Sequence, residues 1–265
     1  MILHVVWEDD GLDNLVPVLE LKERIPKILL QRYSELMDAS YFIPCEKQIH
    51  TVQEISWKSW KDRLMAERLI RKAGIVSAFL KENNGHWEET FWWLLARNFG
   101  AKVNAAAFEE MARTMPVSLL ARHRSQIHQL EALLLGQSGL LGEEPPDDYY
   151  SLLQKEYQFL KNKYKLRPIH QPVHFLRMRP GNFPTVRLAQ LASLIQNTGQ
   201  LFSVIKEAVS LKEVKKIFDV TANDYWHYHY RFGEASFLKK KNLGESMTDT
   251  IIINTVCPVL FAYGS

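Results

Sequence analysis

The chain has 265 residues with 46% hydrophobic and 24% charged side chains, values that are ordinary for a soluble globular protein. A chain of this length forms one large domain or two smaller ones and buries enough surface to need no disulfide bond. Its two cysteines, Cys45 and Cys257, lie in no Cys-x-x-Cys or Cys/His cluster, which argues against a structural zinc site and fits a reducing compartment. The start, MILHVVWEDDG, lacks the cationic segment of a targeting signal, so we expect a cytoplasmic protein.

Two short strands are predicted at the N-terminus. The segments ILHVVWE (2–8) and VPVLEL (16–21) are rich in β-branched and aromatic residues, and a turn-like EDDGLDN connects them. Two strands do not form a stable sheet alone. We therefore expect this element either to pack on helices or to pair with strands that lie outside this chain.

Helical spacing of apolar residues begins at Lys22 and continues along the chain. Asn182 is expected to cap a helix that carries Pro184 in its first turn and runs to about Gln196. The pattern predicts further helices over 56–80, 87–99, 104–114, 117–135, 147–164, 200–208 and 211–218.

The last apolar run, IIINTVCPVLFAYG, follows a capping-box pair formed by Ser246 and Asp249. Asn254 and Pro258 interrupt the run, which is shorter than the ~20 residues that a membrane span needs. We expect a buried helix here and no membrane partner. The predicted fold is mainly α: a small β element of two short strands over 1–21 and a multi-helical domain over 22–265.

Positive charge is concentrated in one window. Residues 157–206 contain eight Lys and Arg and no Asp or Glu, and the acidic loop EEPPDD at 143–148 lies just before them. A block of this kind attracts anions. Its centre is HFLRMRPGNFPTVRLAQL, in which Arg177, Arg179 and Arg187 stand among apolar residues.

Arginines in an apolar setting keep their charge, so each needs a carboxylate, a backbone carbonyl or a bound anion. One interpretation is internal pairing with acids on apolar helices, namely Glu67, Glu88, Glu89 and Glu131. The other is contact with a phosphate or a nucleic acid. The candidate binding residues are Lys163, Lys165, Arg167, Arg177, Arg179, Asn182 and Arg187, with His170 and His174 as further candidates. A third hypothesis is a phosphoester-binding enzyme in which His170 or His174 serves as acid or base, although no paired nucleophile is evident.

The segment YWHYHYRFG (225–233) places His227 and His229 two residues apart, as some metal sites require. No third ligand is visible nearby, so we expect no metal here. Packing of aromatic rings explains the pattern more simply. Interleaving of aromatic and basic residues for single-stranded nucleic acid is the alternative.

Other motifs name no reaction. The adjacent Glu88 and Glu89 face about 100° apart on a helix, which suits helix-dipole stabilisation better than acid–base catalysis. Gly136, Gly139 and Gly142 precede no Gly-Lys-Ser/Thr and more simply admit close packing of a helix. A Gly-x-Ser-x-Gly elbow is absent from the sequence.

Several segments together resemble a bacterial family known as domain of unknown function 2851. In chain order they are ILHVVWEDD, RLMAERL, WEETFWWLLARNFG, QLEALLLGQSGLL, FLRMRPGNFPTVRLAQLA, YWHYHYRFG and IIINTVCPVLFAYG. Members of that family typically carry upstream strands that resemble the acidic core of PD-(D/E)XK-like nucleases, in which a divalent metal activates water. This chain starts after those motifs, so the resemblance assigns no catalytic acid to any residue here.

The sequence therefore predicts association with DNA or RNA through a basic, arginine-rich region, as the helical part of a nuclease-like protein. The alternative is a non-catalytic helical scaffold or interaction module with structural arginines. No cofactor is evident, and a divalent metal is expected only with the upstream nuclease-like part.

Overall fold

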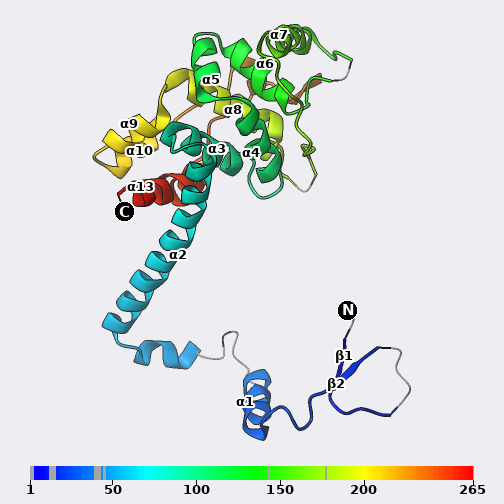
Figure 1. Cartoon of the computed structure of the whole chain (residues 1–265), viewed down its shortest axis with the longest axis vertical. Coiled ribbons are helices and arrows are strands. Elements are labelled where there is room, and N and C mark those ends of the chain that lie inside the picture. The colour runs from blue at the N-terminus through cyan, green and yellow to red at the C-terminus, as the bar shows by residue number, and fades with distance from the viewer. Residues whose placement is uncertain are drawn as a thin grey trace. The chain divides into compact units, whose positions relative to one another are not determined.

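The computed structural model describes residues 3–11, 16–38, 43, 46–142, 144–176 and 178–264 (Figure 1). Backbone contacts divide the chain into an N-terminal unit, Met1–Leu64, and a C-terminal unit, Met65–Ser265. The division falls inside the long helix α2 (Glu54–Glu82), whereas the sequence pattern placed a boundary after residue 21. Helix α1 (Lys27–Met37) therefore groups with the strands that precede it.

The N-terminal unit contains the two predicted strands, β1 (His4–Val6) and β2 (Val18–Glu20), followed by α1 and the 3-10 helix η1 (Glu46–Thr51). The strands are parallel, with Val5 opposite Leu19. No residue of α1 is buried, and its apolar positions Ile28, Leu29 and Met37 are exposed. Among the residues described before Met65, no hydrophobic side chain is buried. The core of the molecule lies in the C-terminal unit.

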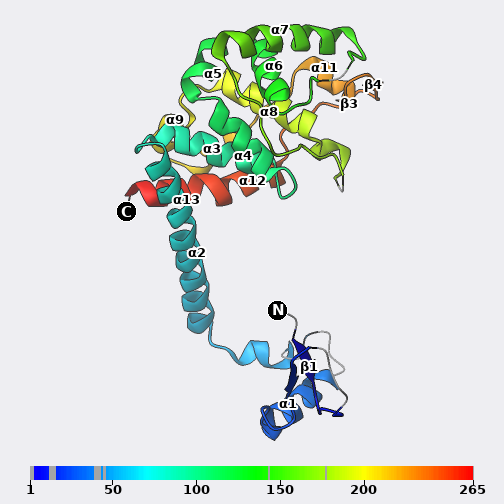
Figure 2. The same ribbon diagram turned by 45° about the vertical axis from the view of Figure 1, so that its right-hand side comes forward.

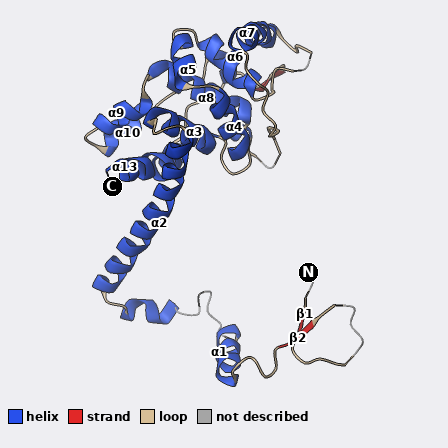
Figure 3. Cartoon of the chain, viewed as in Figure 1, coloured by secondary structure: helices blue, strands red, loops and turns tan. Residues whose placement is uncertain are grey.

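The C-terminal unit is built from helices packed around a buried core (Figure 3). Helix α3 packs on α4, and α6 packs on both α7 and α8. The helices run over α3 (Trp87–Phe99), α4 (Ala105–Thr114), α5 (Val117–His123), α6 (Ile127–Gln137), α7 (Asp148–Tyr164) and α8 (Pro184–Asn197). The mainly helical prediction is confirmed, with α3, α4 and α7 within one residue of their predicted bounds.

The helix predicted over 117–135 is divided into two helices in the structure. The chain turns at Gln126, whose backbone is extended, so the predicted 117–135 divides into α5 and α6. Every residue from Leu130 to Gln137 is buried. A helix that is apolar all round gives no periodic signal of where it begins. Gly136 admits the close packing that the sequence indicated, because a Cβ at that position would lie 2.1 Å from the Tyr157 ring of α7.

The chain after α8 forms α9 (Leu201–Glu207), α10 (Leu211–Ile217) and the short α11 (Asp224–His227). It then forms an antiparallel ribbon of β3 (His229–Arg231) and β4 (Glu234–Ala235), which the sequence did not predict. The strands have three and two residues, which is too short for an alternating pattern to be recognised.

The C-terminal segment is helical throughout, over α12 (Glu245–Ile251), the π-helical turn η3 (Ile252–Val256) and α13 (Cys257–Gly264). Figure 2 shows it running along α3, which contacts both α12 and η3. The amide of Cys257 donates to the carbonyl of Ile252, five residues earlier, and this wide turn accommodates Pro258 in the next position. The predicted capping box is wrong, because the N-cap is Gly244 and Ser246 lies inside the helix.

By length and composition, the 20-residue stretch Glu245–Gly264 is apolar enough to cross a membrane. The predicted apolar run, residues 251–264, forms the C-terminal part of this stretch. Ile251, Val256 and Val259 of this stretch lie in the core, and 44% of the apolar window is buried. The absence of a membrane partner stays a prediction.

Candidate functional site

A hollow of about 770 Å³ lies where the 3-10 helix η2 (Pro180–Asn182), α8, β3 and the start of α12 meet. We call it the cationic hollow. Its wall includes three cations and three asparagines, namely Arg179, Arg187, Lys239, Asn98, Asn182 and Asn242. Neither a carboxylate nor a histidine is among the described residues that line it. The hollow therefore offers an anion several donors and no competing negative charge.

Arg187 is the buried member of the set, with 9% of its surface exposed. Its Nη1 donates to Oε1 of Gln190 at 2.9 Å, and its Nη2 donates to Oδ1 of Asn182. Its Nε is buried and has no hydrogen-bond partner in the described part of the chain. Burial lowers the pKa of Arg187 to about 10, so the guanidinium still carries its charge at neutral pH. Within the described residues it makes hydrogen bonds to amides but no ion pair.

The two amides that receive Arg187 are themselves fixed in the fold. Gln190 Nε2 donates to the carbonyls of Lys241 at 3.1 Å and Asn242 at 3.0 Å, which leaves its Oε1 for Arg187. Asn182 does not cap α8 as predicted, since Phe183 occupies the N-cap and Pro184 begins the helix. The side chain of Asn182 instead reaches the guanidinium. An amide oxygen carries only a partial charge, so these contacts position Arg187 without neutralising it.

Arg179 and Lys239 are exposed at the wall of the same hollow. Arg179 precedes η2, and its carbonyl accepts from the amide of Asn182 at 2.8 Å. The amide of Lys239 donates to the carbonyl of His227 at 2.9 Å. Both side chains are therefore anchored through their backbones, with their charged ends in solvent. Arg177, the third arginine of the stretch, lies outside the described residues.

The other predicted cations lie elsewhere. Lys163, Lys165 and Arg167 are exposed at the end of α7 and do not line the cationic hollow. Lys163 lies 5.1 Å from the centroid of the Tyr164 ring, and Lys165 ends α7 in the left-handed region, with φ 52°. The carbonyl of Arg167 accepts a hydrogen bond from Gln137. The structure thus separates the basic window into two surfaces.

His170 and His174 do not line the cationic hollow, and hydrogen bonds hold the backbone of each residue. Nδ1 of His170 lies 2.8 Å from Oε1 of Glu110, which also accepts from the amide of His170 at 2.9 Å. Asn104 holds the backbone of His174 from both sides, through its carbonyl oxygen at 2.8 Å and its amide nitrogen at 2.9 Å. Neither imidazole faces Arg187 across the cationic hollow, so the geometry does not support an acid–base partner for a bound anion there.

The two histidines of residues 225–233, which we call the aromatic segment, have different surroundings. His229 is stacked on Tyr225, with ring centroids 4.1 Å apart and planes at 4°. His227 is buried, with Nδ1 3.4 Å from Oδ1 of Asp224. Among the described residues, no group of three or more His, Cys, Asp or Glu side chains is arranged to hold a metal ion.

Three of the four acids proposed as internal partners, Glu88, Glu89 and Glu131, make other contacts. Glu88 accepts from the amides of Phe202 at 3.0 Å and Ser203 at 3.3 Å, at the start of α9. Glu89 accepts from the amide of Val117 at 2.8 Å, at the start of α5. Burial raises the pKa of both carboxyls. They do stabilise helix N-termini, but those of neighbouring helices as well as their own.

Glu131 is fully buried and also lacks a cation. Its Oε2 accepts from the hydroxyl of Tyr149 at 2.7 Å and from Nε1 of Trp226 at 3.0 Å. Its Oε1 is buried with no partner among the described atoms. Burial raises the pKa of Glu131 to about 7. The interpretation that Glu88, Glu89 or Glu131 neutralises Arg187 is therefore wrong.

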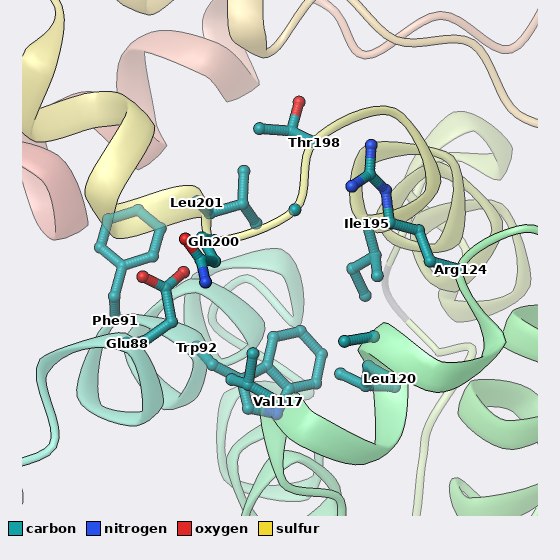
Figure 4. A pocket seen from close by; sticks show the side chains of 12 residues that line it. Glu88, Phe91, Trp92, Val117, Leu120, Arg124, Ile195, Thr198, Gln200 and Leu201 are labelled. Carbon is teal, nitrogen blue, oxygen red and sulfur yellow. The ribbon is translucent and has the colours of Figure 1, made fainter.

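A second hollow, of only about 40 Å³, lies between α3, α5 and the start of α9 (Figure 4). We call it the apolar hollow. Trp92, Val117 and Leu201 line it, with Glu88 and Arg124 on opposite sides in this view. Arg124 donates from Nε to the carbonyl of Gln196 at 2.8 Å and from Nη2 to that of Asn197 at 3.3 Å. The guanidinium of Arg124 thus binds carbonyls at the C-terminal end of α8.

Sequence reasoning found Arg179, Asn182 and Arg187 but missed Lys239, Asn98 and Asn242. The run Lys239–Lys241 was a usable signal, since three consecutive lysines follow the aromatic segment by a few residues. Asn98 and Asn242 carried none, because they come from segments that only the folded chain brings beside Arg187.

The family model described as "Protein of unknown function (DUF2851)" matches residues 1–265. No curated protein matches the chain, and no solved structure does.

Proposed function

Because the chain belongs to the family described as "Protein of unknown function (DUF2851)", whose description names no activity, we propose from the site alone that the protein binds nucleic acid through its phosphates. One observation carries the proposal. Arg187 is a buried, charged guanidinium in the wall of an open hollow that has no carboxylate among its described lining residues. A phosphate would supply the counter-charge that the described fold does not.

The surroundings of Arg187 suit a phosphate better than a carboxylate of the protein. Arg179 and Lys239 add exposed cations, and the amide nitrogen of Asn182 is a further donor beside the guanidinium. Phosphate contacts of this kind give affinity and position without sequence readout. The exposed Lys163, Lys165 and Arg167 at the end of α7 lie outside the cationic hollow and would act only through long-range attraction of a polyanion.

Salt dependence tests the proposal. Binding of a short oligonucleotide should be measured by filter retention from about 50 to 300 mM salt, where each phosphate contact contributes a slope of about −0.7 to −0.9 in log affinity against log salt. Contacts from Arg179, Arg187 and Lys239 predict a total slope of about −2 to −3. No retention at the lowest salt would count decisively against nucleic-acid binding.

The alternative is a non-catalytic scaffold whose arginines are structural. Other arginines of this fold do have structural contacts. Arg113, for example, pairs with Glu109 at 2.9 Å and lies over the ring of Trp93. The charge reversal Arg179→Glu separates the two functions. The side chain of Arg179 is exposed, so we expect an unchanged melting temperature together with weaker oligonucleotide binding. A large fall in melting temperature would instead support a structural role.

A further inference from the structure

The loop after β4 carries two apolar side chains into solvent. Phe237 is 97% exposed and Leu238 is 62% exposed. Lysines follow at once, in the order Lys239, Lys240 and Lys241. We call Phe237–Leu238 the aromatic tip. Single exposed apolar residues are common on proteins, so exposure alone assigns no role to it.

The aromatic tip is fixed on both sides by the aromatic segment. Before it, the amide of Ser236 donates to the carbonyl of Tyr228 at 2.6 Å, and its hydroxyl donates to the same oxygen at 2.9 Å. After it, the amide of Lys239 donates to the carbonyl of His227. The protein thus holds the backbone that presents the tip, and a binding partner would not have to order this loop.

Lys241 reinforces the same loop from inside. It is buried, with 4% of its surface exposed, and its Nζ donates to the carbonyl of Lys239 at 3.1 Å. The ammonium lies 3.7 Å from the centroid of the Tyr230 ring, an arrangement in which the ring face attracts the cation. Tyr230 and Lys239 both line the cationic hollow. One set of contacts therefore fixes the tip and part of the hollow together.

The tip and the hollow are adjacent along the chain. Phe237 precedes Lys239 by two residues, so their Cα atoms lie within about 7 Å of each other. A nucleotide has a charged phosphate and a flat base separated by a sugar. The cationic hollow offers donors to the phosphate, and the exposed phenyl ring of Phe237, two residues before Lys239, offers a face to the base.

We propose that the cationic hollow and the aromatic tip bind single-stranded nucleic acid, with a phosphate at Arg187 and an unpaired base stacked on Phe237. This inference rests on the proposed function and narrows it to unpaired strands. In a duplex each base already stacks on its neighbours, and exposing a face to Phe237 would require unstacking. In a single strand the faces are free, and stacking on aromatic rings adds affinity to that of the phosphate contacts.

A lipid surface also combines phosphate with apolar groups, but the observations favour a nucleotide. Two apolar side chains bury little area in a bilayer, and membrane binding grows with that area. The asparagines of the hollow, Asn98, Asn182 and Asn242, offer hydrogen-bonding groups that suit the polar sugar of a nucleotide.

The test compares strands and variants by fluorescence anisotropy. The full chain is titrated into labelled single-stranded DNA and RNA of about 15 nucleotides and into a duplex of the same length. Phe237→Ala should weaken single-strand binding about tenfold, the effect of losing one stacked base, and leave duplex binding unchanged. Phe237→Trp should retain or strengthen it. Phe261→Ala is the matched control, because Phe261 is 38% exposed on α13 and does not line the cationic hollow, and it should bind as the unsubstituted chain does.

The outcomes separate the two proposals. If the unsubstituted chain binds neither strand form, the proposed function itself fails. If it binds both and Phe237→Ala changes neither affinity, phosphate binding stands and the stacking inference is overturned. The inference is also overturned if Phe237→Ala abolishes binding to vesicles of phosphatidylserine and phosphatidylcholine while leaving oligonucleotide binding intact.

Discussion

Arg124 lines the apolar hollow and Arg187 lines the cationic hollow, and the two side chains differ in the groups to which their guanidinium donates hydrogen bonds. Arg124 in the apolar hollow donates to two backbone carbonyls at the end of α8, where the helix leaves carbonyls unsatisfied. Arg187 in the cationic hollow donates to two amide oxygens, and its Nε has no hydrogen-bond partner in the described part of the chain. Residue type and charge are the same at both places.

The groups that surround a guanidinium indicate whether the arginine is structural or binds a ligand. A guanidinium that satisfies the end of a helix contributes to the fold, and its removal should affect stability. A buried guanidinium without a carboxylate costs stability in the free protein, and a bound anion offsets that cost. Comparing substitutions at the two positions therefore separates a structural arginine from a binding one.

The largest expected effect is on binding. Arg187→Met removes the cation but keeps a side chain of similar length, and it should weaken oligonucleotide binding about ten- to a hundredfold, since hydrogen bonds to charged groups contribute about 1.5–3 kcal/mol. Arg124→Met should bind as the unsubstituted chain does. Anisotropy titrations at low salt measure both. Equal losses of affinity in the two variants would contradict the assignment of a binding role to Arg187 alone.

The next effect concerns Glu131, another buried ionisable group without a counter-charge among the described residues. Its folded-state pKa of about 7 lies above the ordinary 4.5, so it binds its proton more tightly in the folded chain. The resulting stabilisation is fully present below pH 4.5 and is lost as the pH rises through 7. Between pH 5 and 8 we expect a loss of about 2 kcal/mol.

Urea unfolding at several pH values measures this loss. Glu131→Gln cannot ionise, so its stability should change little over the same range. A fall of the same size in both chains would show that another group is responsible. Glu131 differs from Arg187 in one respect. A buried carboxyl becomes neutral by taking up a proton, whereas a buried guanidinium keeps its charge.

A smaller effect is expected on stability at Arg124. Arg124→Met removes hydrogen bonds to Gln196 and Asn197 from an exposed side chain and should lower the free energy of unfolding by about 1 kcal/mol. Arg187→Met should leave it unchanged or raise it, because an uncompensated buried charge is removed. Thermal unfolding of the two variants checks whether Arg124→Met is less stable than Arg187→Met, the reverse of their order in binding. A strongly destabilised Arg187→Met would mark that arginine as structural.

The smallest expected effect is on the salt dependence of oligonucleotide binding. Lys239→Gln removes one exposed cation from the cationic hollow and should reduce the slope of log affinity against log salt by about 0.7 for a single strand. Lys212 is an exposed lysine on α10, outside the described lining of the hollow, and Lys212→Gln should leave the slope unchanged. Two variants with identical slopes would place the phosphates elsewhere.

Much of the fold followed from patterns within single segments. Amphipathic spacing predicted α3, α4 and α7 within a residue, because each has one apolar face and a clear turn at its end. The division between α5 and α6 was not predictable in this way, since α6 is buried all round. The ribbon β3–β4 was missed because its strands are shorter than the pattern they would display.

The candidate site was half predictable, for a physical reason. A window free of carboxylates pointed to Arg179 and Arg187, since charge imbalance is a property of the sequence. What neutralises Arg187 is a property of the fold. Glu88 and Glu131 were plausible partners by composition, yet one serves the start of α9 and the other lies with Tyr149 and Trp226.

The most direct measurement is the nitrogen-15 NMR signal of Arg187 Nε–H, assigned by its loss in Arg187→Met. Burial should protect this proton from exchange with water and keep its signal visible. Addition of a short phosphorylated oligonucleotide should shift that signal at the concentrations that give binding. A signal that stays in place while those of other arginines move would contradict the assignment of Arg187 to the phosphate.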